Sequence, residues 1–245
     1  MIGILAELLL SYILLLLIER KNLSILGWQP STKRLVQLSV GLLLSITLAI
    51  IFHLVRSLFT GVTWKINTAY RFTDFIAALW WMLKSVIYEE LIFRGALFYI
   101  ALKRLGVIKG LWLSITAFGI YHWFSFSTFG QPVQMLFIFL ITAAAGWMYA
   151  YAFLKTNSLY LPIGLHLGWN CVGSILFSEG SIGKHILLPV KDPAFQQNDL
   201  MAFLFMMLYQ LLVPAFCTWL YVRKLDGEKT YVPPLRNLCV LLSLR

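Results

Sequence analysis

Long apolar stretches follow one another along this sequence of 245 residues and limit what it can fold into. A helix needs about 20 mostly apolar residues to cross the hydrocarbon core of a bilayer, with a tolerance of about 17–25. Seven stretches meet this requirement, with boundaries open by several residues: 2–18, 35–55, 74–100, 110–126, 133–154, 159–177 and 200–222. We therefore predict an all-α fold, a polytopic transmembrane helical bundle of about seven to eight helices. The eighth would be a surface helix at 60–72.

Composition points to the same class of protein. Hydrophobic residues make up 60% of the chain and charged residues 12%, whereas soluble domains have about 45–50% apolar and about 25% charged residues. A water-soluble fold of this size could not bury so much apolar surface, so the soluble, disordered, fibrous and disulfide-scaffold classes are excluded. The length fits one domain, and we predict that residues 1–245 form a single integral membrane domain.

Basic residues predict the orientation of the bundle. The net charge is +10, which in a membrane protein indicates basic cytoplasmic loops and contact with anionic lipid, not nucleic-acid binding. If the loop at 19–34 is cytoplasmic, that side receives thirteen Lys and Arg residues and the other side five. This distribution predicts an outer N-terminus, an inner C-terminus and a basic cytoplasmic tail at 226–245. Short loops favour the bacterial cytoplasmic membrane.

The third apolar stretch, 74–100, carries charged residues that would be costly to expose to lipid. Glu89, Glu90 and Arg94 lie within it, and a charged group near the bilayer centre costs about 2.5–3.5 kcal/mol. These side chains must therefore face protein or trapped water. Glu90 and Arg94 are four residues apart, so they share a helix face and can form an ion pair. Glu89 points about 100° away from Glu90 and is available for another task.

Further polar residues lie in two other stretches at similar depth. His122 is in the fourth, and His166 and Asn170 are four residues apart in the sixth. At about 1.5 Å per residue, Glu89, His122 and His166 lie roughly 22, 18 and 10 Å from their helix ends, which places all three between mid-membrane and the cytoplasmic half. A buried carboxylate can take a proton from water, imidazoles can orient that water or bind a metal, and an amide can stabilise an oxyanion. The set predicts hydrolytic chemistry.

Other interpretations of these residues stay open. The charges could form a structural ion-pair cluster, and the histidines could be satisfied core residues. Glutamate, histidine and arginine also line proton relays, so a proton- or ion-coupled transporter is an alternative, although we find no inverted repeat and no matching pair of broken helices. A non-catalytic immunity or scaffold protein is a third interpretation.

Three short motifs, taken in order, resemble a known family. Glu89-Glu90-x-x-x-Arg94, Phe118-x-x-x-His122 and His166-x-x-x-Asn170 are similar to the motifs of the CPBP (Abi) family, which contains the type II CAAX prenyl endopeptidases and bacteriocin-processing and immunity proteins. The resemblance covers residues 74–177. It implies an intramembrane endopeptidase acting on a peptide or membrane protein of a membrane-associated or prenylated type.

The resemblance also implies roles for individual residues. Glu89 would be the general base that activates water, with Glu90 assisting it and Arg94 holding Glu90. The histidines His122 and His166 would orient water or bind metal. Asn170 would stabilise the oxyanion, with Phe118 in support.

The metal requirement stays open at this point. The chain has no H-E-x-x-H, the helix motif that places two histidine ligands and a glutamate base together. His122, His166 and Glu89 could make a three-ligand site for a divalent metal such as zinc. They could equally form a metal-free glutamate–histidine site, which we favour.

Overall fold

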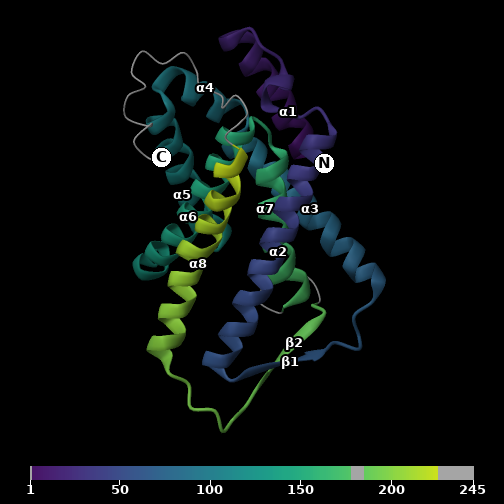
Figure 1. Ribbon diagram of the computed structural model, residues 1–245, viewed down its shortest axis with the longest axis vertical. Helices are drawn as coiled ribbons and strands as arrows, with labels where there is room; N and C mark the ends of the chain where they lie inside the picture. The colour runs from purple at the N-terminus through teal and green to yellow at the C-terminus, as the bar shows by residue number, and fades with distance from the viewer. Residues whose placement is uncertain (1, 178–184, 226–245) are drawn as a thin grey trace.

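The computed structural model describes residues 2–177 and 185–225, which form a helical bundle with one small sheet (Figure 1). In this part of the chain the helices are α1 (Ile2–Leu14), α2 (Thr32–Thr60), α3 (Phe72–Arg94), α4 (Ala96–Leu105), α5 (Val107–Ser125), α6 (Pro132–Thr156), α7 (Tyr160–Cys171) and α8 (Asp199–Val222). Shorter turns extend or connect them: η1 (Leu15–Glu19), η2 (Leu23–Leu26), η3 (Val172–Leu176) and η4 (Arg223–Leu225). The predicted all-α class is confirmed. The predicted tail at 226–245 lies outside the described residues.

Four helical segments among the described residues are long and apolar enough to cross a bilayer. They are Ile2–Glu19, Thr32–Thr60, Pro132–Thr156 and Asp199–Leu225, and they coincide with four of the seven predicted spans. These apolar helices indicate an integral membrane protein. α3, α5 and α7 do not meet the same criterion. A count of seven to eight membrane crossings therefore stays a prediction.

The third predicted span is not one helix, so the expectation of an uninterrupted helix over 74–100 is wrong. α3 ends at Arg94, Gly95 adopts φ −81° and ψ −142°, and α4 begins at Ala96. A Cβ on Gly95 would collide with the Leu91 carbonyl oxygen, so only glycine permits this bend. The break places Arg94 in the last turn of α3, and α4 continues in a new direction towards α5.

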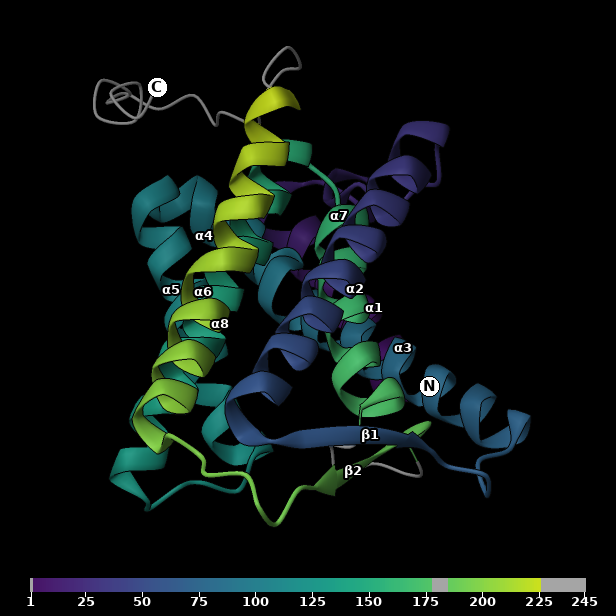
Figure 2. The ribbon, with the colours of Figure 1, turned by 60° about the horizontal axis from the view of Figure 1, so that its bottom comes forward.

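The expectation of a surface helix at 60–72 is also wrong. Val62–Ile66 forms strand β1, which pairs antiparallel with β2 (Leu187–Lys191) in the register Val62↔Lys191 to Ile66↔Leu187. β-branched and aromatic residues favour a strand in this segment, and Gly61 at φ +63° ends α2 in a left-handed cap. The two strands lie across the end of the bundle where α2 ends and α8 begins (Figure 2).

A close contact between α2 and α7 sets the position of α7 in the bundle. A Cβ on Gly41 would lie 2.9 Å from the Leu161 carbonyl oxygen, and a Cβ on Gly168 would lie 2.6 Å from the Leu42 carbonyl oxygen. Small residues let two helix backbones approach each other in this way. α7 is consequently buried along most of its length, and its His166 contacts Glu90 of α3.

Candidate functional site

The polar residues singled out from the sequence meet where α3, α5 and α7 come together. Glu89 and Glu90 lie in the last two turns of α3, His122 lies near the end of α5, and His166 lies in the middle of α7. Each of these four side chains is buried, with 0% of Glu90 and 8% of His122 exposed. The structure therefore brings together four residues that are up to 77 positions apart in the sequence.

Glu90 is the centre of the buried network. One oxygen of its carboxylate, Oε1, lies 3.2 Å from Arg94 Nη1 and 2.8 Å from His166 Nδ1. A second guanidinium nitrogen, Arg94 Nη2, donates to the Gly146 carbonyl oxygen of α6 at 3.1 Å. Buried ion pairs persist only where further hydrogen bonds compensate the lost hydration. The predicted Glu90–Arg94 pair is present, and it is tied to two further helices.

Aromatic rings enclose the Arg94 guanidinium, which is fully buried. Its central carbon lies 4.2 Å from the centre of the Phe118 ring and 5.2 Å from the centre of the Tyr149 ring. Such rings attract a cation by their quadrupole, most strongly where water is excluded. Phe118 of the second motif therefore contacts Arg94 of the first motif. The centre of its ring also lies 4.5 Å from the centre of the His122 ring.

The hydrogen bonds determine the tautomer of both neutral histidines. His122 Nδ1 lies 2.7 Å from the Phe118 carbonyl oxygen, and a carbonyl can only accept. His166 Nδ1 faces the Glu90 carboxylate, which accepts likewise when ionised. Both rings therefore carry their proton on Nδ1, and both Nε2 atoms present a lone pair.

These two Nε2 atoms converge on Glu89. Its Oε2 lies 3.8 Å from His122 Nε2 and 3.8 Å from His166 Nε2, while its Oε1 accepts from the Ser85 hydroxyl at 3.4 Å. Within the described residues Glu89 Oε2 is buried and makes no hydrogen bond. Three acceptors thus face each other at distances too long for a direct hydrogen bond and suited to a bridging water molecule, which can donate to two of them at a time.

Asn170 lies one turn beyond His166 on α7 and is half-buried. Its side-chain amide makes no hydrogen bond within the described residues, so the structure does not join it to the Glu90 network. The amide is available to a ligand at the edge of the cluster.

Sequence reasoning missed the contribution of α6. The Gly146 carbonyl and the Tyr149 ring both contact Arg94, and Tyr149 is 3% exposed. A glycine and a tyrosine three residues apart in an apolar stretch look like ordinary helix packing. The only signal available was that they share a helix face.

The candidate metal ligands do not form a metal-holding group in this arrangement. Among the described residues no cluster of three or more His, Cys, Asp or Glu side chains is placed so that it could hold a metal ion. This includes the set His122, His166 and Glu89.

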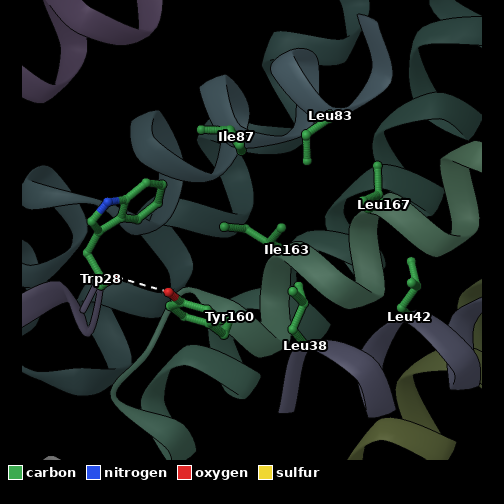
Figure 3. Close-up of a pocket in the computed structure, with 8 residues that line it drawn as sticks. All are labelled: Trp28, Leu38, Leu42, Leu83, Ile87, Tyr160, Ile163 and Leu167. Atoms are coloured by element: carbon green, nitrogen blue, oxygen red, sulfur yellow. Dashed lines mark hydrogen bonds between the residues drawn. The ribbon is translucent and has the colours of Figure 1, made fainter. Parts of the chain in front are cut away.

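An apolar cavity of about 220 Å³ lies between α2, α3 and α7 (Figure 3). Its lining residues are Trp28, Leu38, Leu42, Leu83, Ile87, Tyr160, Ile163 and Leu167. The Tyr160 hydroxyl donates to the Trp28 carbonyl oxygen at 3.1 Å, so the lining offers no strong polar group. Because α3 and α7 also carry the glutamates and His166, the cavity and the polar cluster share two of their walls.

The buried ion pair leads to a stability prediction. Arg94→Met leaves the Glu90 carboxylate buried with one partner fewer, and we expect it to lower the free energy of unfolding by about 3–5 kcal/mol. The double variant Glu90→Gln, Arg94→Met removes both charges and should regain most of that loss. Denaturant unfolding in detergent micelles measures both. Lys84→Met, a half-buried cation on the same helix, is the control, and an Arg94→Met variant as stable as this control would contradict the prediction.

Comparison with known families gives a match over part of the chain. Residues 70–172 match the family model described as type II CAAX prenyl endopeptidase Rce1-like. The matched segment runs from just before α3 to the end of α7 and includes every residue of the predicted site, from Glu89 to Asn170. No curated protein and no solved structure matches the chain.

Proposed function

We propose, from the match of residues 70–172 to the Rce1-like type II CAAX prenyl endopeptidase family model, that this protein hydrolyses a peptide bond of a membrane-associated or prenylated-type substrate with a water activated by Glu89. The family is one of CAAX-type intramembrane proteases, and the cluster on α3, α5 and α7 is its site in this chain. The observation that carries the proposal is the convergence of Glu89 Oε2 with two histidine Nε2 atoms at 3.8 Å each.

The water molecule occupies the gap between these three acceptors. Glu89 takes one proton from it while a histidine Nε2 lone pair accepts a hydrogen bond from the other hydrogen and sets the direction of the water molecule. The water oxygen forms a bond to the scissile carbonyl carbon, and the carbonyl oxygen becomes an oxyanion. Asn170 donates a hydrogen bond to this oxyanion. Glu89 then delivers its proton to the leaving nitrogen as the carbon–nitrogen bond breaks.

Glu90 and Arg94 act through His166 in this scheme. The Glu90 carboxylate accepts a hydrogen bond from His166 Nδ1–H at 2.8 Å. Because the proton then stays on Nδ1, the lone pair is on Nε2, which faces Glu89. Arg94 in turn balances the charge of Glu90 at 3.2 Å. This arrangement resembles the general case in which a carboxylate orients a catalytic imidazole by binding its other nitrogen. The two neighbouring glutamates therefore have separate tasks.

The apolar cavity supports a substrate that carries a hydrocarbon chain. Its walls are aliphatic and aromatic, and they belong to the same helices as the polar cluster (Figure 3). A peptide with a covalently attached isoprenoid or similar chain can place the chain there while its backbone reaches Glu89. Such a substrate would enter from the membrane.

Two contacts support a topology in which the chain ends lie on opposite sides of the bundle, as the predicted orientation requires. β1 follows α2 and β2 follows α7, and they pair with each other, so the ends of α2 and α7 are on one side of the bundle. Glu19 at the end of η1 binds Lys103 and Arg104 at the end of α4, so these ends are on the other side. This alternation fits seven crossings made by all the long helices except α4. The site then belongs to an integral protein of the bacterial cytoplasmic membrane, with its N-terminus outside and its C-terminus inside.

The first test removes the general base. Glu89→Gln and His122→Ala should each lower kcat for a lipidated peptide in proteoliposomes by about 10²–10⁴-fold, because proton transfer from water loses its acceptor or its orientation. Mass spectrometry of the products measures the cleavage. Glu7→Gln, which changes a glutamate of α1 outside the cluster, is the control. Undiminished cleavage by folded Glu89→Gln protein would refute the mechanism.

The second test addresses the metal. Because the scheme uses only a water between Glu89 and the two histidine Nε2 atoms, it predicts that the activity survives dialysis against EDTA and 1,10-phenanthroline, and that elemental analysis of the active protein shows less than one zinc per chain. An activity that disappears on chelation and returns with added zinc would show that the metal-free scheme is wrong.

The third test fills the apolar cavity. Leu38→Trp places an indole in it and should raise KM for a lipidated peptide by about tenfold or more, because the lost apolar contact is worth about 1–3 kcal/mol. The cleavage of the same peptide without its hydrocarbon chain should not change. Leu43→Trp on the exposed side of α2, where Leu43 is 64% exposed, is the matched control. Equal effects on both peptides would argue against this use of the cavity.

A further inference from the structure

α6 presents two groups to the polar cluster from the same helix face. Gly146 accepts a hydrogen bond from Arg94 at 3.1 Å. Tyr149, three residues later, is buried at 3% exposure and lies against the same guanidinium at 5.2 Å. α6 is therefore a wall of the site, although none of the three motifs falls on it.

The Tyr149 ring also stacks on the ring of His166. The two ring centres are 4.7 Å apart and the rings are inclined by only 18°. Phe118 meets the edge of this stack, with its ring at 89° to Tyr149 and at 78° to His166. The His166 imidazole is thus held between an aromatic face and an aromatic edge.

The stack adds a constraint that the hydrogen bond to Glu90 does not supply. A hydrogen bond from His166 Nδ1 to a carboxylate oxygen tolerates a range of angles, so it restrains rotation of the ring about the Cβ–Cγ bond only loosely. Contact with the flat face of Tyr149 removes this rotation. Together the two contacts determine where His166 Nε2 points, which is towards Glu89 Oε2 at 3.8 Å.

We propose that Tyr149 is a positioning residue that holds the plane of His166, so that His166 Nε2 stays directed at the water beside Glu89. The proposal rests on the proposed function for its catalytic consequence. The contacts involve the aromatic ring of Tyr149, so the ring and not the hydroxyl performs this task. A displacement of a catalytic group by about 1 Å can cost about 10²-fold in rate, which sets the scale of the expected effect.

The test separates the ring from the hydroxyl and from simple packing. Tyr149→Phe should keep the wild-type kcat. Tyr149→Leu and Tyr149→Met, which are apolar but not flat, should lower kcat by about 10–100-fold with little change in KM, because binding does not depend on the His166 plane. Tyr151→Leu is the matched control, since Tyr151 stacks on Trp147 at 5.1 Å on the same helix away from the cluster.

A second readout does not require catalysis. In ¹⁵N-labelled protein the His166 Nε2 resonance should be sharp in the wild type and in Tyr149→Phe. In Tyr149→Leu it should be broadened or doubled, because the ring then samples more than one orientation while Glu90 still holds the proton on Nδ1. This spectrum tests the positioning even if no peptide is cleaved. Wild-type kcat together with a wild-type His166 spectrum in folded Tyr149→Leu would overturn the proposal. Failure of both the Leu and Met variants to fold would also overturn it, because Tyr149 would then serve packing alone.

Discussion

The Glu90 carboxylate is the interaction on which the rest of the site depends. It is fully buried in a helix bundle of a membrane protein, where an unpaired charge would be too costly to keep. One of its oxygens binds Arg94 and His166 together. Arg94 extends the contact to the Gly146 carbonyl of α6. These hydrogen bonds of Glu90 and Arg94 can form only if α3, α6 and α7 meet at one place.

The same contacts also determine which atoms surround the neighbouring carboxylate, Glu89. Because Glu90 and the Phe118 carbonyl occupy the Nδ1 atoms of His166 and His122, both Nε2 atoms are left as acceptors facing Glu89. Glu89 itself is held by α3 at a different angle and is not drawn into the ion pair. Glu89 and Glu90 thus make different contacts because their side chains point in different directions. The apolar cavity lies between α2, α3 and α7, so two of the helices that line it also carry residues of the polar cluster (Figure 3).

The elements that the sequence did not predict depend on distant contacts. Residues 62–66 form a strand because a partner at 187–191 lies next to them, and no local pattern reveals a partner more than a hundred residues away. The bend at Gly95 follows from a single glycine in an apolar stretch, where glycine is also common as a packing residue. The contacts of Tyr149 with Arg94 and His166 could not be predicted for a similar reason, since an aromatic residue in a membrane span usually only packs against its neighbours.

The sequence by itself determined the class of protein, because apolar length and scarce charge permit no other solvent than lipid. It also determined which residues had to be satisfied internally, since Glu89, Glu90 and Arg94 lie where lipid cannot solvate them, and the spacing of four residues paired Glu90 with Arg94. Only the tertiary structure decided that His166 binds Glu90 and not Glu89, that His122 Nε2 faces Glu89, and that α6 contributes contacts to Arg94. Those choices depend on the rotation and tilt of one helix against another, which are set by close contacts such as Gly41 and Gly168 between α2 and α7 and not by the residues of any one helix.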